Sequence, residues 1–211
     1  REGGMIRSAG IRNEMIHILN DSEHYDAKTR AYMAMALSRF QEPEAARALA
    51  DALRKVDESE ASELPLFLMW AVGNLRSKPA AQEVTRFLGS EHDDVRKTAA
   101  YVLGVLGDKE VIPKLEHSLE DSVLDVRWNA ALSLARLGAD SGVRVLIQML
   151  DRNYLREVRQ MNDAEIERVM VNAAKGLGLI HSPEARAVLE EISKKDPNLK
   201  VRQAALAIFN D

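Results

Sequence analysis

Apolar residues recur along the chain with the spacing of an amphipathic helix, and this pattern itself repeats. Residues 95–107 read VRKTAAYVLGVLG, and residues 126–138, starting 31 positions later, read VRWNAALSLARLG. In each copy the first, fifth, ninth and twelfth positions are apolar and fall on one stripe of a helix. Further copies start at Thr29, Leu64, Val169 and Val201. The pattern therefore predicts six similar helices.

A second periodic run follows the copies, so the repeating unit is predicted to be a helical hairpin. Prolines mark the starts of these second helices, where the missing N–H costs nothing: Pro43, Pro79, Pro113 and Pro183. Gly107 and Gly138 are expected to close first helices, because glycine adopts the left-handed cap without steric cost. Such hairpins bury their apolar stripes only by stacking. We expect an all-α protein, a right-handed α-solenoid of about five to six hairpins.

The motif D-x-V-R-x-x-A-A-x-x-L-G-x-L-G, followed by a proline-led second helix, resembles the HEAT-like repeat of phycobilisome lyase subunits. The resemblance covers the chain from about Lys28 and implies an armadillo/HEAT-like superhelix. Scaffolds, adaptors, lyase subunits and a few enzymes contain this repeat, so it implies a fold more than a function.

We expect one repeat domain over residues 1–211. Residues 1–28 would form an N-terminal cap or partial repeat, and residues 152–163 an insertion. The repeats are expected to begin at about residues 29, 64, 95, 126, 169 and 201. Because the first residue is Arg1 and not methionine, the chain is expected to be a fragment of a longer protein.

The composition narrows the range of expected partners and locations. The formal charge is -4, so a nucleic acid is not the expected partner. The chain has no cysteine, which excludes disulfides. No apolar run approaches the length of a membrane span, and no signal peptide is evident. We expect no membrane insertion and a cytoplasmic location. The partner's identity, its pathway and the oligomeric state are not determined at this level.

No chemical motif stands out. The histidines have no i, i+4 pair that would place two imidazoles on one helix face. Deoxyhypusine hydroxylase, an enzyme of this fold class, holds iron with repeated His-Glu dipeptides, and this chain has none. No Ser, His, Asp grouping or phosphate loop appears either. We expect no catalytic residue, no metal and no cofactor, and hence a protein that is not an enzyme.

Arginines recur at one position of the pattern: Arg30, Arg96, Arg127 and Arg202. They could form an anion-binding row, but we favour an internal ladder in which each guanidinium binds a carboxylate or a helix-end carbonyl of the neighbouring repeat. Trp128 lies beside Arg127, where the other copies have Lys97, Ala31 or Gln203, and is expected to be partly exposed.

The stretch from Asp151 to Glu165 breaks the period and carries basic and aromatic residues, namely Arg152, Tyr154, Arg156 and Arg159. Arginine and aromatic residues are enriched in interface hot spots, which favours a binding element. The alternative is a solvated helical extension whose arginines pair with nearby acids, namely Asp151, Glu157 and Asp163.

The second helices carry a variable polar stripe that is expected to line the concave face and bind a partner. The candidate residues on it are Arg47, Asp51, Arg54, Arg86, His117, Arg144, Gln148 and Glu191. Mixed charge suits a protein or peptide. We expect a non-catalytic protein-interaction scaffold or adaptor. A bilin lyase-like subunit is the first alternative, and a nucleic-acid-binding HEAT-like protein ranks last.

Overall fold

The computed structural model describes residues 2–57 and 63–209, and every regular element within them is a helix. The chain divides into two compact units, unit 1 (residues 1–111) and unit 2 (residues 112–211). Helical hairpins stack within each unit, which confirms the expected all-α solenoid class. No helix in the described residues combines the length and apolar character needed to cross a membrane.

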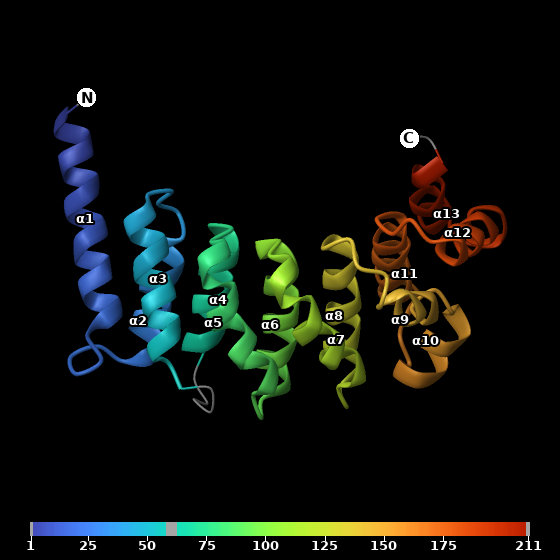
Figure 1. Ribbon diagram of the computed structural model, residues 1–211, viewed down its shortest axis with the longest axis horizontal. Coiled ribbons are helices and arrows are strands. Elements are labelled where there is room, and N and C mark those ends of the chain that lie inside the picture. The colour runs from blue at the N-terminus through green and yellow to red at the C-terminus, as the bar shows by residue number, and fades with distance from the viewer. Residues whose placement is uncertain (1, 58–62, 210–211) are drawn as a thin grey trace. The chain divides into compact units, whose positions relative to one another are not determined.

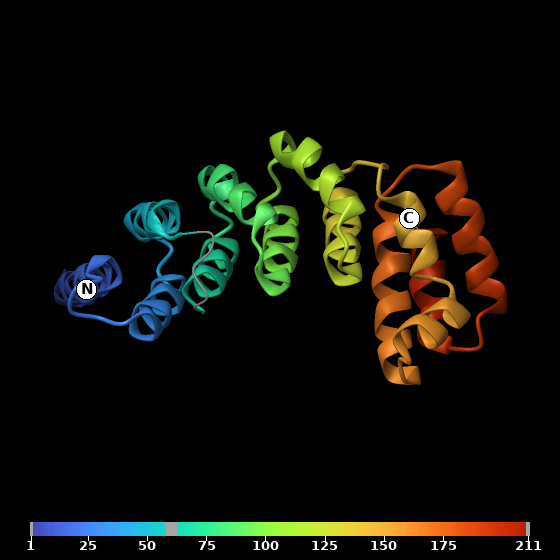
Figure 2. The same ribbon diagram turned by 90° about the horizontal axis from the view of Figure 1, so that it is seen from below.

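Unit 1 packs its helices in two layers (Figure 1, Figure 2). Helices α2 (Ala27–Leu37), α4 (Leu64–Asn74) and α6 (Asp93–Leu106) lie side by side. Helix α3 (Pro43–Lys55) and the run of η1 (Lys78–Ala80), α5 (Ala81–Thr85) and η2 (Arg86–Gly89) form the other layer. Helix α1 (Glu2–Asn20) packs on α2 and α3, and η3 (Lys109–Val111) packs against α5.

Unit 2 repeats this arrangement. Helices α8 (Leu124–Arg136), α11 (Asp163–Gly178) and α13 (Leu199–Leu206) lie side by side, and η5 (Ala207–Phe209) continues α13. Their companions are α7 (Ile112–His117) with η4 (Ser118–Glu120), α9 (Val143–Gln148) and α12 (Pro183–Lys195). The insertion forms an extra helix, α10 (Arg152–Arg159), which packs on α11.

Small residues let the helices approach closely. The paired alanines of the first helices are fully buried, namely Ala99, Ala100, Ala130, Ala131, Ala173 and Ala174. Gly142, at the start of α9, lies so close to α8 that an added Cβ would sit 2.9 Å from the Cα of Ala131. Hairpin packing therefore depends on the absence of side-chain volume at these positions.

Helix ends follow the signals in the sequence. Gly107 and Gly138 adopt left-handed backbone angles, with φ of 72° and 79°. Pro43 and Pro183 lie in the first turns of α3 and α12. Asn162 begins α11 with a reciprocal cap, since its side chain accepts from the Glu165 N–H and the Glu165 carboxylate accepts from the Asn162 N–H.

The recurrent arginines form structural contacts, as predicted. Nη1 of Arg96, Arg127 and Arg202 donates to the carbonyl oxygen six residues earlier, at 2.8, 2.6 and 2.7 Å respectively. Each also donates to the next carbonyl along the chain. Nε of Arg30 donates to the Leu19 carbonyl at 2.9 Å. These bonds tie the start of a first helix to the end of the preceding element.

The expectation that Trp128 is partly exposed is wrong, because its side chain is only 6% exposed. Trp128 belongs to the same buried cluster as Leu155 of α10. The insertion helix thus adds apolar surface to this core that a regular repeat would lack.

Replacing Arg127 by methionine (Arg127→Met) should lower the free energy of unfolding by about 2 kcal/mol, because two carbonyl oxygens lose a charged donor. Urea unfolding measures the change. Arg168→Met, at an exposed arginine of α11, is the matched control and should change it by less than about 0.5 kcal/mol. Equal effects of the two substitutions would contradict the ladder.

Gly142→Ala should destabilise the protein by about 1 to 3 kcal/mol, because the new methyl group meets the α8 backbone. Gly10→Ala makes the same chemical change inside α1, where a Cβ has nothing within 4 Å. That control should stabilise by about 1 kcal/mol through helix propensity. A neutral Gly142→Ala in thermal unfolding would show that the hairpins do not need this close approach.

Candidate functional site

The structure brings four of the predicted residues together in unit 1. Arg47, Asp51 and Arg54 share one exposed face of α3, and Arg86 lies on η2. A hollow of 590 Å³, here called the α3 groove, lies between α3 and the turn that precedes α5. Its lining is Pro43, Ala46, Arg47, Ala50, Asp51, Arg54, Arg76, Ser77, Lys78 and Pro79.

Two of these arginines are held by internal contacts. Nε of Arg54 donates to Glu83 at 2.8 Å, and its Nη1 donates to Asp51 at 3.0 Å. The Glu83 carboxylate raises the pKa of Arg54 above its usual value. Arg86 donates to the carbonyls of Arg54 and Val56 at the end of α3. These contacts of Arg54 and Arg86 therefore hold α3 against α5 and η2 beside the groove. The two guanidinium groups also offset the charges of Asp51 and Glu83.

Three further cations at the rim of the groove are not held by ion pairs. Arg47, Arg76 and Lys78 are exposed, and no ion pair joins any of them to the described part of the chain. Between them lie small apolar side chains, namely Pro43, Ala46, Ala50 and Pro79. A cationic rim around an apolar floor suits a ligand that carries both carboxylates and an apolar group.

Arg76 has an unfavourable backbone conformation. Its φ is 48°, in the left-handed region, at the end of a first helix where other repeats use Gly107 and Gly138. This conformation destabilises a non-glycine residue by about 1 to 2 kcal/mol. Strained residues cluster at functional sites, so the strain is a second indication that this turn has a role beyond packing. Arg76 and Lys78 were not predicted from the sequence, where an arginine at a position that is glycine in other repeats was the available signal.

A smaller hollow lies on the other side of α3. It measures 290 Å³ and is lined by α1 and α3, including Ile16, Glu44 and Lys55. Arg47 and Asp51 line both hollows and so form the ridge between them. This second hollow mixes charges of both signs.

The predicted residues of the second helices in unit 2 lie on three different helices. His117 of α7 is exposed, with Nδ1 2.6 Å from the Pro113 carbonyl oxygen. Arg144 and Gln148 are exposed on α9, and Glu191 of α12 pairs with Lys195 at 3.0 Å. Their assignment to a partner surface stays a prediction.

The insertion is docked on unit 2. Arg152 pairs with the buried Asp196 at 2.8 Å, and Leu155 is fully buried. Tyr154 is half-buried against the same core. Arg156 binds Asp163 at 2.7 Å, as the alternative of pairing with nearby acids expected, whereas the partner of Arg152 lies outside the insertion.

Asp151 has a different role, since its carboxylate caps α10. The side chain of Arg159 lies outside the described residues. Several polar side chains of the insertion therefore form contacts that hold α10 in place.

Comparison with known proteins supports the repeat assignment. A family model described as HEAT repeats matches residues 56–125 and 81–164, which together are more than half of the chain. The resemblance to HEAT-like repeats found in the sequence is thus confirmed.

Solved structures share the fold. The complex of CpcE and CpcF of phycocyanin lyase from Nostoc sp. PCC7120 is 23% identical, with a TM-score of 0.63 over 93% of this chain and 75% of that one. An engineered protein is 20% identical, with a TM-score of 0.51 over 94% of this chain and 95% of that one. At these identities the likeness concerns the fold alone.

One curated relative corrects an expectation. Deoxyhypusine hydroxylase from Arabidopsis thaliana is 27% identical over 118 residues, which are 55% of this chain and 38% of that enzyme. Because the relative is an enzyme, this finding overturns the expectation that the chain is not one. The match spans well under half of the hydroxylase.

The residues present do not fit the hydroxylase's iron. The chain has no His-Glu dipeptide, and the described residues contain no group of three or more His, Cys, Asp or Glu side chains able to hold a metal ion.

Arg76→Gly should stabilise the protein by about 0.5 to 1 kcal/mol, since relief of the strained φ exceeds the added entropy of the unfolded chain. Gly138→Arg tests the reverse exchange at the equivalent position, where a Cβ has open space, and should destabilise by about 1 kcal/mol. Thermal unfolding measures both variants. Destabilisation by Arg76→Gly would show that Arg76 is needed for folding and is not a strained functional residue.

Proposed function

The chain belongs to the family of HEAT-repeat proteins, and on this premise we propose that it binds another protein through the α3 groove. The HEAT-repeat fold is consistent with a scaffold. The observation that carries the proposal is the set of three exposed cations, Arg47, Arg76 and Lys78, around an apolar floor. The expected ligand is a short segment with acidic residues beside a small or medium apolar side chain.

The charge distribution favours a peptide over a polyanion. The whole chain carries a charge of -4, which repels nucleic acids at long range. Asp51 lines the groove together with the three cations, and Glu83 binds Arg54 of the same lining, so a continuous phosphate backbone would meet acidic groups as well. A peptide can place its carboxylates opposite the cations and leave these acids uncovered.

The groove is open, so its charges are expected to act on association rate and specificity more than on the lifetime of the complex. The apolar floor supplies the contact area that slows dissociation. Binding is therefore expected to weaken as the salt concentration rises, without being abolished.

A library of random 12-residue peptides displayed on phage tests the proposal with the intact chain as bait. Selected peptides should be rich in Asp and Glu next to Leu, Val or Ala. The double variant Arg47→Glu with Lys78→Glu should weaken the best peptide by about tenfold or more, because two attractions become repulsions. Fluorescence anisotropy with the labelled peptide measures the change.

The matched control is Lys114→Glu with Arg168→Glu, which makes the same change of charge at exposed positions of unit 2. It should leave the affinity within about twofold. Selected peptides that lack acidic residues, or that bind both double variants equally well, would refute the α3 groove as the binding site.

A further inference from the structure

The α3 groove and the smaller hollow on the other side of α3 share part of their walls. The smaller hollow, here called the α1–α3 hollow, measures 290 Å³. Arg47 and Asp51 line both of them. Both side chains are exposed, and they lie one turn apart on the same face of α3. They therefore form a single ridge that a bound segment can contact from either side.

The acids that line the α1–α3 hollow are already compensated within the chain. The carboxylate of Glu44 lies 3.7 Å from the guanidinium of Arg12. The carboxylate of Asp51 accepts a hydrogen bond from Arg54 at 3.0 Å. The lining has charges of both signs, but its negative charges therefore have cationic partners inside unit 1.

Two cations of the α1–α3 hollow have no such partner. Arg47 lies on the ridge and Lys55 in the last turn of α3, and both are exposed. No ion pair joins either of them to the described part of the chain. The floor is apolar, since it includes the half-buried Ile16 and the buried Ala48. The α1–α3 hollow thus repeats the chemistry of the α3 groove, with unpaired cations around an apolar floor.

One ligand suits this arrangement better than two. Separate acidic ligands in the two hollows would compete for Arg47 and repel each other across the ridge. A single segment that crosses the ridge binds Arg47 once and gains the second hollow as an intramolecular contact. The ridge is as wide as a helix, about 10 Å, which about three residues of extended chain span. Three residues of an α-helix rise only about 4.5 Å and would not reach across.

We propose that the α3 groove and the α1–α3 hollow form one bipartite site, which binds an extended acidic segment of another protein across α3. The segment places one apolar side chain on the floor of each hollow, with acidic residues opposite Arg47 and Lys55. The inference rests on the proposed function, because it requires that the α3 groove binds a peptide. It adds the conformation of the ligand and a second anchor.

Peptide selection on three forms of the chain tests for the second anchor. The library of random 12-residue peptides is panned against the intact chain, against Lys55→Glu and against Lys175→Glu. Peptides from the intact chain should carry two clusters of acidic and apolar residues with about three residues between them. Lys55→Glu should select peptides with one cluster, because the new carboxylate repels the second.

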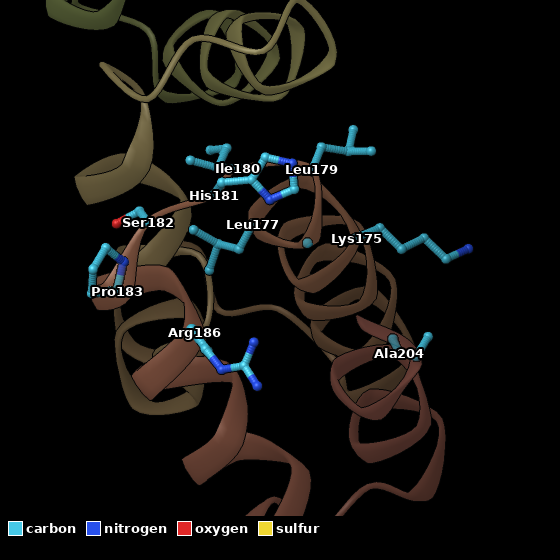
Figure 3. A pocket seen from close by; sticks show the side chains of 11 residues that line it. Lys175, Leu177, Leu179, Ile180, His181, Ser182, Pro183, Arg186 and Ala204 are labelled. Carbon is cyan, nitrogen blue, oxygen red and sulfur yellow. The ribbon is translucent and has the colours of Figure 1, made fainter. Parts of the chain in front are cut away.

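Lys175→Glu is the matched control, because it reverses the charge of an exposed lysine at a different hollow. That hollow, of 710 Å³, lies in unit 2 where α11 ends and α12 begins, and Figure 3 shows Lys175 at its outer edge. It shares no lining residue with the two hollows beside α3. Peptides selected on this control should carry both clusters.

Methyl NMR locates the bound peptide. The best peptide selected on the intact chain, and each of its two halves, are titrated into the chain labelled at its alanine and isoleucine methyl groups. The complete peptide should shift the signals of Ala46 and Ala50 in the α3 groove together with those of Ile16 and Ala48 in the α1–α3 hollow. Each half should shift one of these pairs and bind at least about tenfold more weakly.

The neutral variant Lys55→Gln separates charge from stability, because glutamate near the C-terminal end of a helix also disfavours the helix. It should weaken the complete peptide by about threefold. The half that shifts Ala46 and Ala50 should bind Lys55→Gln as tightly as it binds the intact chain.

Two results would overturn the bipartite site and leave the proposed function standing. One is selection of the same single-cluster peptides by the intact chain and by Lys55→Glu. The other is a complete peptide that shifts Ala46 and Ala50 but leaves Ile16 and Ala48 unchanged. A selection that yields no peptide, or only peptides that bind Arg47→Glu with Lys78→Glu as well as the intact chain, would overturn both.

Discussion

The structure depends on close contact between helices at positions that carry almost no side chain. A hairpin cannot bury its apolar stripe alone, so each one needs its neighbours. Buried alanines such as Ala131 allow that approach, and at Gly142 the helix backbones come so close that even a methyl group is excluded. The arginine bonds to helix-end carbonyls then fix where successive elements meet, since a charged donor satisfies groups that a helix end leaves unpaired. Packing and polar contacts thus specify the same arrangement.

This constraint decides which surface charges are available for binding. Several arginines that the sequence suggested as partner-binding residues instead hold elements of the fold together. Arg54 joins α3 to Glu83, Arg86 closes the end of α3, and Arg152 fastens the insertion to Asp196. Arg47, Arg76 and Lys78 are exposed, have no ion pair within the described residues and line the α3 groove together. The binding hypothesis is therefore more specific than a polar stripe along every second helix.

The comparisons separate fold from activity. The HEAT-repeat model and the solved structures agree on stacked helical hairpins, a scaffold on which unrelated functions have been built. The Arabidopsis hydroxylase shows that relatives of this chain include an enzyme, although the chain carries none of the His-Glu pairs associated with the hydroxylase's iron. A shared repeat fold therefore does not carry with it the chemistry of the surface residues.

The sequence by itself determined the helices, their pairing into hairpins and the role of the recurrent arginines. These follow from periodicity, caps and contacts between residues close in the chain, such as Arg127 with the Asp121 carbonyl. Only the tertiary structure decided that Trp128 is buried and that Arg152 meets Asp196, 44 residues away. It alone placed Arg76 and Lys78 beside Arg47. The reason is physical: burial and ion pairing depend on which helices pack together, and an amphipathic pattern specifies a buried face without naming the residues that will cover it.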